Sequence, residues 1–368
     1  MRVFWVFRGY LDERMDAGAL VKMAEAVGRK GNEMFLVTGY KRIKDEKAPV
    51  VYLRSLSVPI LNYICQTVSA RVALLRLARS GDVIMAEPYM APAVLPFALL
   101  ARFGARGFRV VLDVRTLPVE RGRFISALDK ALFKAGLFLG RRFFSGATVI
   151  TYAMARALKK WLGRLPLGVW GSGVDLAVFD PARYDRESER KRWGFGREQV
   201  FLYHGALSSR GRGLVEAAAA FREAKLENAV LVFAGEGELS SEIKDRGGPS
   251  VRIMPPVPHS EVPSLLAACD FVVIPFLRTP VIDTSCPVKL LEALAMEKPI
   301  VGTDVPPLRE LLEGSRFWFK AERPKELVKV FREAAASGVS KASGARDIAR
   351  EYSFDAQAER LIRFLRLI

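Results

Sequence analysis

Residues 271–292 read FVVIPFLRTPVIDTSCPVKLLE and connect an apolar strand pattern to the start of a helix. The apolar run 271–274 indicates a buried strand, and the prolines that follow interrupt it. Pro287 is expected at the first helical position, where its missing N–H would be unpaired anyway. The N–H groups of Val288 and Lys289 would then point out of the helix beside the positive end of its dipole, so an anion is expected to bind there.

Two charged side chains extend this predicted anion site. Lys289 adds a full positive charge, and Glu292 follows one turn later on the same helix face. A carboxylate would repel a bound phosphate, so Glu292 is expected to accept hydrogen bonds from ribose hydroxyls. An ordinary capped helix with a Lys–Glu pair is the alternative.

Outward from this stretch, short apolar runs alternate with helical patterns along most of the chain. Such alternation predicts an α/β fold with parallel sheets that are covered on both faces. The Gly-, Pro- and Asp-rich segment 171–185 interrupts the alternation and marks a domain boundary. The predicted strands are 3–7, 33–38, 50–53, 82–86, 109–113, 147–150 and 168–170 in the first half, and 200–203, 229–234, 251–254, 271–274 and 299–303 in the second.

Two Rossmann-like domains are therefore predicted, at 1–175 and 176–346. The amphipathic segment 347–368 is expected to form a closing helix that packs back toward the first domain. Open parallel sheets bind ligands at the carboxyl ends of their strands, so the cleft between two facing domains is the expected site.

Composition narrows the class of protein. No apolar run is long enough to span a membrane, and the N-terminus has a strand pattern with no cleavage site for a signal peptide. The three cysteines, Cys65, Cys269 and Cys286, show neither disulfide nor metal spacing, and two histidines are too few for a histidine-rich metal site. A cytoplasmic protein without a metal or a resident cofactor is expected.

Positive charge is concentrated in the first half of the chain. Of the formal net charge of +17, residues 1–175 carry +15, from 28 Lys and Arg against 13 Asp and Glu. This asymmetry favours an anionic partner for the first domain, such as a lipid surface, a phosphorylated acceptor or a nucleic acid. The alternative is charge for solubility in a thermophile, which the total of only six Asn and Gln also fits.

Two glycine-rich loops follow predicted strands of the second domain. The loop 203–213 contains Gly205, Arg210 and Arg212; glycine allows close approach of a ligand, and arginines can neutralise a diphosphate. The second loop is Gly235-Glu236-Gly237, which alone is a weak signal because many such sequences are simple turns.

Taken in order, these segments resemble the group 1 glycosyltransferases (glycosyltransferase family 4, GT-B fold). Gly205 with Arg212-Gly213 matches the glycine–basic loop of that family, and 235–237 matches its G-[DE]-G turn. The segment 257–270 is similar to the part that passes the nucleotide base, and 173–181 to the interdomain linker. Residues 287–295, followed by Lys298-Pro299, resemble the S-x-P-x-K-x-x-E branch of the E-x(7)-E signature. The similarity covers nearly the whole chain.

The chain departs from the family pattern at three places. The first glutamate of the signature falls at Thr284, with Asp283 beside it, so the contact to the donor sugar differs. Ala206 stands where an arginine is common. The first half has no histidine, and its nearest equivalent is Asp113-Val114-Arg115, followed by Glu120; a buried pair that fixes the loop is the structural alternative for Asp113 and Arg115.

The resemblance implies a retaining, metal-independent hexosyltransferase that uses a nucleoside-diphosphate sugar as co-substrate. The negative charge that develops on the leaving diphosphate must be stabilised, a task that arginine, lysine and helix amides suit. The residues implied as catalytic are Arg212, Lys289, Asp113 and Arg115. The residues implied in donor binding are Gly18, Gly205, Arg210, Gly235, Val257, Thr284, Ser285, Pro287, Val288 and Glu292.

The expected acceptor is a lipid-phosphate-linked molecule or a glycan, reached at the cytoplasmic face of the membrane. Segment Phe124–Phe144 mixes bulky apolar residues with cations, as an interfacial helix does, although a helix that covers a sheet also needs an apolar face.

Three alternatives remain. A basic nucleic-acid-binding protein explains the charge but lacks a zinc-finger, RRM or helix-turn-helix signature. Another GT-B enzyme, such as a nucleotide-sugar epimerase or a phosphorylase, would share the fold. An inactive scaffold could have lost catalysis with Thr284 and Ala206.

Overall fold

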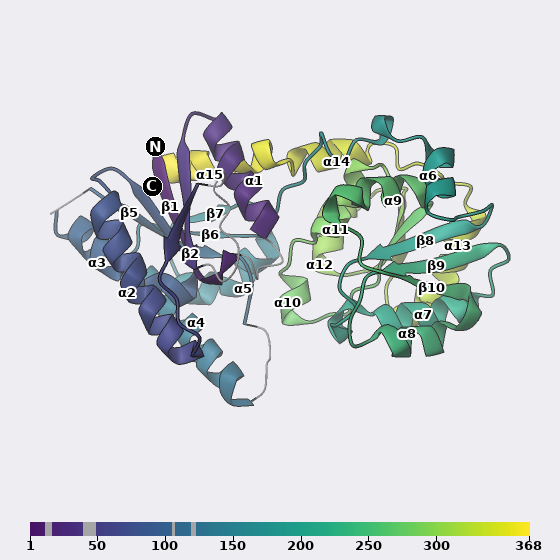
Figure 1. Ribbon diagram of the computed structural model, residues 1–368, viewed down its shortest axis with the longest axis horizontal. Coiled ribbons are helices and arrows are strands. Elements are labelled where there is room, and N and C mark those ends of the chain that lie inside the picture. Colours follow the sequence, from purple (N-terminus) through teal and green to yellow (C-terminus); the bar gives the residue numbers. More distant parts are fainter. Residues whose placement is uncertain (12–16, 40–48, 105–106, 119–122) are drawn as a thin grey trace. The chain divides into compact units, whose positions relative to one another are not determined.

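A computed structural model describes the protein, and the chain forms two compact units (Figure 1). The first unit contains Met1–Gly173, Thr284–Cys286 and Phe354–Ile368, and the second contains Val174–Asp283 and Pro287–Ser353. Residues 1–11, 17–39, 49–104, 107–118 and 123–368 are described.

The first unit is built on a seven-stranded parallel sheet with the strand order β3-β2-β1-β4-β5-β6-β7. The order reverses between β1 and β4, which pair directly from Val3–Val83 to Val6–Ala86. Such a reversal leaves a crevice at the carboxyl ends of the two strands. The strands are β1 (Arg2–Tyr10), β2 (Glu33–Gly39), β3 (Val50–Leu53), β4 (Val83–Ala86), β5 (Arg109–Val114), β6 (Gly146–Val149) and β7 (Leu167–Val169).

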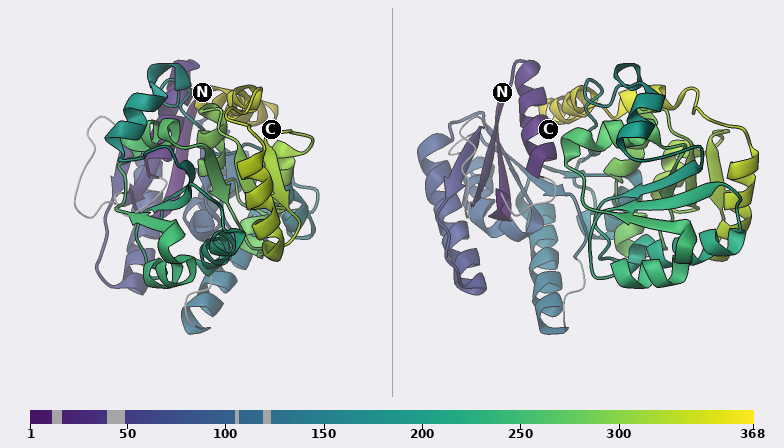
Figure 2. Two further views of the ribbon diagram at one scale, coloured as in Figure 1. Left: turned by 90° about the vertical axis from the view of Figure 1, so that its right-hand side faces the viewer. Right: turned by 45° about the vertical axis from the view of Figure 1, so that its right-hand side comes forward.

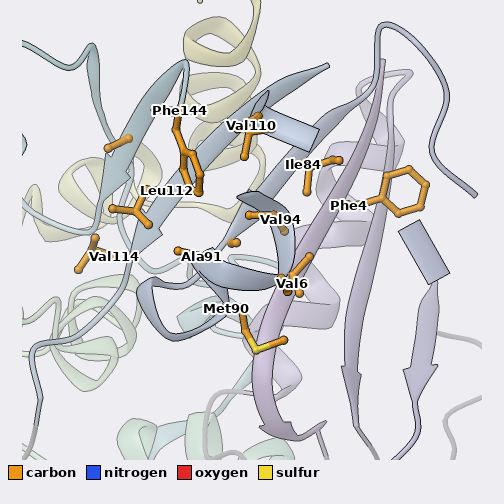
Figure 3. Close-up of a cluster of buried hydrophobic side chains, with 14 of the residues drawn as sticks. Phe4, Val6, Ile84, Met90, Ala91, Val94, Val110, Leu112, Val114 and Phe144 are labelled. Carbon is orange, nitrogen blue, oxygen red and sulfur yellow. The ribbon is translucent and has the colours of Figure 1, made fainter. Parts of the chain in front are cut away.

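Helices cover both faces of this sheet because successive strand residues point to opposite sides. Phe4 and Val6 of β1 enter one buried cluster, which Figure 3 shows together with Ala91 and Val94 of a helix on that side. Val3, Trp5 and Phe7 enter the other cluster. The first side carries α2 (Pro59–Leu77), α3 (Ala91–Arg102), α4 (Arg123–Phe143) and α5 (Tyr152–Leu162), and the second carries α1 (Ala17–Arg29) and α15 (Phe354–Leu367).

The second unit has a six-stranded parallel sheet with the order β10-β9-β8-β11-β12-β13, again covered by helices on both faces (Figure 2). Phe201 of β8 stacks on Phe271 of β11 with ring centroids 4.7 Å apart, which fixes these neighbouring strands through their side chains. The strands are β8 (Gln199–His204), β9 (Ala229–Ala234), β10 (Val251–Met254), β11 (Phe271–Ile274), β12 (Ile300–Thr303) and β13 (Trp318–Ala321). The helices are α6 (Arg186–Arg192), α7 (Leu214–Ala224), α8 (Ser240–Gly247), α9 (Val262–Ala268), α10 (Pro280–Asp283), α11 (Val288–Ala295), α12 (Pro306–Leu312), α13 (Leu327–Ala336) and α14 (Ala345–Glu351).

The predicted α/β fold with two parallel sheets is confirmed. The edge strand β13 was not predicted, because its four residues include Lys320 and show no clear apolar run. The single closing helix expected over 347–368 is instead two helices, α14 and α15, separated by Tyr352 and Ser353. Only α15 belongs to the first unit, where it packs against α1.

Candidate functional site

Lys289 lies directly over Gly205 in the second unit. Strand β8 ends at His204, and Gly205 follows with φ of +114°, a backbone conformation that favours glycine. A Cβ atom at Gly205 would lie 2.4 Å from Cε and 2.7 Å from Nζ of Lys289. A side chain at this position would displace the end of the Lys289 side chain and would also be strained by the positive φ, which gives the glycine of the motif a structural reason.

The start of α11 differs from the prediction by one residue. The helix begins at Val288, and Pro287 is its N-cap with ψ of 106°, so Pro287 is not the first helical residue. Its carbonyl accepts the hydrogen bond from Leu290 N at 3.0 Å. Val288 and Lys289 therefore still supply the first N–H groups of the helix, as the anion site requires.

Burial, reinforced by the positive charge of Arg212, lowers the pKa of Lys289 to about 8, while Glu292 acts in the opposite direction. The ammonium group lies 5.6 Å from the ring centroid of Tyr203. An anion that approaches this side chain would stabilise its charged form and raise its pKa.

Arg212 is anchored beside this lysine. It lies in the 3-10 turn Arg210–Arg212, and its Nη1 donates to the Tyr203 hydroxyl and to the Ala206 carbonyl, both at 3.0 Å. Arg210, two residues earlier, is exposed and pairs with Glu242 of α8 at 2.8 Å. Of the two arginines in the loop, Arg212 is the one that the fold holds beside Lys289.

Glu292 is 3% exposed and lies between the two histidines of the chain. His259 Nε2 is 2.7 Å from Oε1, and His204 Nε2 is 3.6 Å from Oε2. Burial lowers the pKa of His204 to about 4 against the opposing effect of Glu292, so this imidazole is neutral near pH 7 and makes no ion pair. Burial acts to raise the pKa of Glu292, but the hydrogen bond with His259 and the nearby charges outweigh it and hold that pKa below its usual value.

Neither histidine was predicted as a functional residue. His204 and His259 are 55 positions apart, and each stands in a segment that was interpreted for other reasons. The available signal was weak: both occur in the second half, His204 at the end of one strand and His259 in the 3-10 turn that follows another.

The two glycine loops pack against each other at the carboxyl ends of β8 and β9. Gly205 N donates to Ala234 O at 2.8 Å, and a Cβ atom at Gly235 would lie 2.1 Å from Gly205 O. A Cβ atom at Gly237 would lie 2.4 Å from the carbonyl carbon of Leu207. Val257 follows β10 at the same edge and is half-buried. Gly205, Gly235 and Val257 therefore lie together at the carboxyl-terminal ends of these strands.

In the first unit, Asp113 is fully buried at the end of β5. Its Oδ2 accepts from Trp5 Nε1 at 2.9 Å and its Oδ1 from Thr148 Oγ1 at 2.6 Å. Burial raises its pKa to about 6, although Arg115 and both donors act to lower it. Arg115 donates to Trp170 O at 3.1 Å, with its guanidinium 3.9 Å from the Trp170 ring centroid. These contacts favour the structural alternative for Asp113; Glu120 lies outside the described residues.

The other predicted residues lie with the first unit. Gly18 is the second residue of α1, and among the described residues a Cβ atom there would meet no atom within 4 Å. Thr284 and Ser285 group with the first unit, where Thr151 Oγ1 donates to Thr284 O at 2.9 Å. In the described part of the chain, no cluster of three or more His, Cys, Asp or Glu is arranged to hold a metal ion.

Comparison with known proteins agrees with this geometry. Two Rossmann-like parallel sheets define the fold class of the GT-B glycosyltransferases. Sucrose-phosphate synthase from Thermosynechococcus elongatus superposes with a TM-score of 0.76 over 100% of this chain and 99% of its own, at 13% identity. Anabaena HepE, in complex with UDP-glucose, gives 0.74 over 100% of both chains at 16% identity.

Residues 198–336 match the family model of the glycosyl transferases group 1, which confirms the predicted resemblance over this part of the chain. The teichuronic acid biosynthesis glycosyltransferase TuaC of Bacillus subtilis (strain 168) is 26% identical over 176 residues. That match covers 47% of this chain and 43% of the relative, which is less than half of either protein.

Proposed function

We propose that the protein transfers a hexosyl group from a nucleoside-diphosphate sugar to an acceptor, with retention of anomeric configuration and without a metal ion. The arrangement of Lys289 over Gly205, with Arg212 and Glu292 beside it, is the observation that carries this proposal. This arrangement combines cations that can bind a diphosphate with a buried carboxylate that can accept from a sugar hydroxyl. It lies at the carboxyl ends of the strands, where parallel sheets bind ligands.

In this proposal the diphosphate lies against the start of α11. Lys289, Arg212 and the N–H groups of Val288 and Lys289 neutralise it, and Val257 lies near the base. Glu292 accepts from the ribose hydroxyls. Since Oε1 is already within 2.7 Å of His259 Nε2, ribose binding either shares this oxygen with the imidazole or displaces it.

The proposed transfer step uses the same charged side chains. The bond from the anomeric carbon to the diphosphate oxygen breaks, and the acceptor oxygen bonds to the same face of the sugar while its proton passes to the departing diphosphate. Lys289 and Arg212 stabilise the negative charge that develops there. Asp113 is proposed as a positioning residue of the first unit, where Trp5 and Thr148 donate hydrogen bonds to its carboxylate.

We further propose a lipid-linked or glycan acceptor and a peripheral position at the cytoplasmic face of a membrane. The net charge of +15 on residues 1–175 supports an anionic partner for this half. The name of TuaC assigns that relative to teichuronic acid biosynthesis, which supports a glycan product. Among the described helices, none has the length and apolar character to cross a membrane.

Thermal-shift screening with UDP-, GDP-, ADP- and dTDP-sugars tests the donor. HepE was solved with UDP-glucose, so UDP sugars are the first to try. At least one nucleotide sugar should raise the melting temperature, and wild type should hydrolyse or transfer the sugar of that donor. If no nucleotide sugar stabilises the folded protein, the donor proposal is wrong. Binding without hydrolysis or transfer of the sugar would favour an inactive scaffold.

A further inference from the structure

The largest group of exposed apolar side chains lies on α2 and on the residues just before it. Nine of the sixteen exposed large hydrophobic residues in the described part of the chain fall between Leu56 and Leu77. Ile60 is 61% exposed, Ile64 53% and Val68 51%. Contiguous apolar surface of this kind is uncommon on a monomer unless it contacts a partner. The nine are Leu56, Val58, Ile60, Leu61, Ile64, Val68, Val72, Leu75 and Leu77.

Six of them, Ile60, Leu61, Ile64, Val68, Val72 and Leu75, form a stripe on the face of α2 that points away from the sheet. Gln66, Ala70 and Leu74 recur every four residues and are at most 1% exposed. Ile64 and Val68 are offset from them by two positions, which is about 200° around a helix axis. Helix α2 (Figure 1) is therefore apolar on its outer face as well as on its inner one. A helix that is apolar all round is normally buried, so the outer face is expected to have a partner.

The charges around this stripe select the kind of partner. Residues 49–81 contain four arginines and neither aspartate nor glutamate. Arg54, Arg76 and Arg79 are exposed. A second copy of this chain on the stripe would bring these cations against their own equivalents, because a two-fold interface pairs a surface with itself. A bilayer with anionic headgroups supplies both the apolar layer and the opposite charge.

Helix α4, in the segment predicted for this role, is less suited to it. Its Phe133 and Leu137 belong to the buried core of the first unit, with 5% and 1% exposure. Leu128 and Phe138 remain exposed at 42% and 63%, but they lie ten positions apart and form no continuous stripe. In the described part of α4, apolar side chains such as Phe133 and Leu137 therefore pack against the sheet.

We propose that the outer stripe of α2, together with Leu56 and Val58, docks the first unit on an anionic lipid bilayer. The helix lies in the plane of the interface, with its apolar residues in the acyl boundary and Arg54, Arg76 and Arg79 among the headgroups. This inference rests on the proposed function only where it takes the acceptor to be lipid-linked. Beyond the proposed function, this inference identifies α2 as the helix that contacts the membrane.

Co-sedimentation with phosphatidylcholine vesicles, with and without phosphatidylglycerol, tests the docking surface. The test variant is Ile60→Ser/Ile64→Ser/Val68→Ser, and the matched control is Phe103→Ser/Leu128→Ser/Phe138→Ser, which removes three exposed apolar side chains elsewhere in the same unit. Wild type and control should bind the anionic vesicles, and salt should weaken that binding. The α2 variant should bind at least about tenfold more weakly.

Several outcomes would overturn the proposal. The α2 variant could pellet as wild type does, the control could be the variant that loses binding, or wild type could stay in the supernatant. A wild-type dimer that the α2 variant converts to a monomer would show that a second copy covers the stripe. Thermal melting and calorimetry with the donor are run on all three proteins. Vesicle binding without donor binding would refute the proposed function and leave the docking surface intact.

Discussion

The affinity for a nucleoside-diphosphate sugar should fall with rising pH because of Lys289. Its pKa of about 8 in the free protein means that the amine is mostly charged near pH 7 and mostly neutral near pH 9. A bound diphosphate favours the charged form and raises this pKa in the complex. Binding is therefore strongest below the pKa of the free protein and weakens as pH rises through it.

The size of the effect follows from the same values. Each pH unit between the free and bound pKa values of Lys289 costs about tenfold in affinity, or about 1.4 kcal/mol. A hydrogen bond to a charged group contributes about 1.5–3 kcal/mol, so the fall should end after about one to two units. Between about pH 7 and pH 9 the dissociation constant should rise close to tenfold.

Isothermal titration calorimetry across this range measures the effect, with a nucleotide sugar whose diphosphate carries no titrating proton there. Lys289→Met is the control: it should bind about 10–150-fold more weakly near pH 7 and should lose the pH dependence. Equal wild-type affinity at both ends of the range would show that Lys289 does not contact the diphosphate. A slope that persists in Lys289→Met would assign the titration to another group.

Three substitutions test the remaining contacts. Gly205→Ala should destabilise the fold by about 1–3 kcal/mol because of the positive φ, and it should weaken donor binding because the new Cβ displaces Lys289. The control is Gly211→Ala, whose Cβ would meet no atom closer than 3.6 Å and which should change stability by less than about 0.5 kcal/mol. Equal unfolding curves for the two variants would contradict this prediction. Glu292→Ala should weaken donor binding at least about tenfold by calorimetry, and unchanged binding by a folded variant would remove Glu292 from the site. Arg212→Ala should lower kcat roughly a hundredfold or more, and a change in KM alone would make Arg212 a binding residue.

The strands and their alternation with helices could be predicted because they depend on local patterns. A short apolar run between turn signals is typical of a buried strand, and every strand predicted in this way is present. Lys289 and Glu292 could also be placed on one face of a helix, since three residues are close to one turn. The edge strand β13 was missed because edge strands need no continuous apolar run.

Contacts between distant residues could not be predicted from these patterns. The strand order places β8 next to β11, and the segments that follow these strands then bring Gly205 beneath Lys289, 84 positions away in the chain. The same order brings His204 and His259 to one carboxylate. In the first unit, the pairing of Asp113 with Trp5 follows from β1 and β5 flanking β4.

The sequence by itself thus determined two parallel α/β sheets, the concentration of positive charge in the first half, and the candidate helix start with its lysine and glutamate. The tertiary structure alone decided which of these residues meet: Arg212 lies beside Lys289, and Arg210 forms an ion pair with Glu242. It also decided which face of α2 stays exposed. The physical reason is that local periodicity fixes the direction of a side chain relative to its own element. What that side chain faces depends on how the elements are ordered and packed.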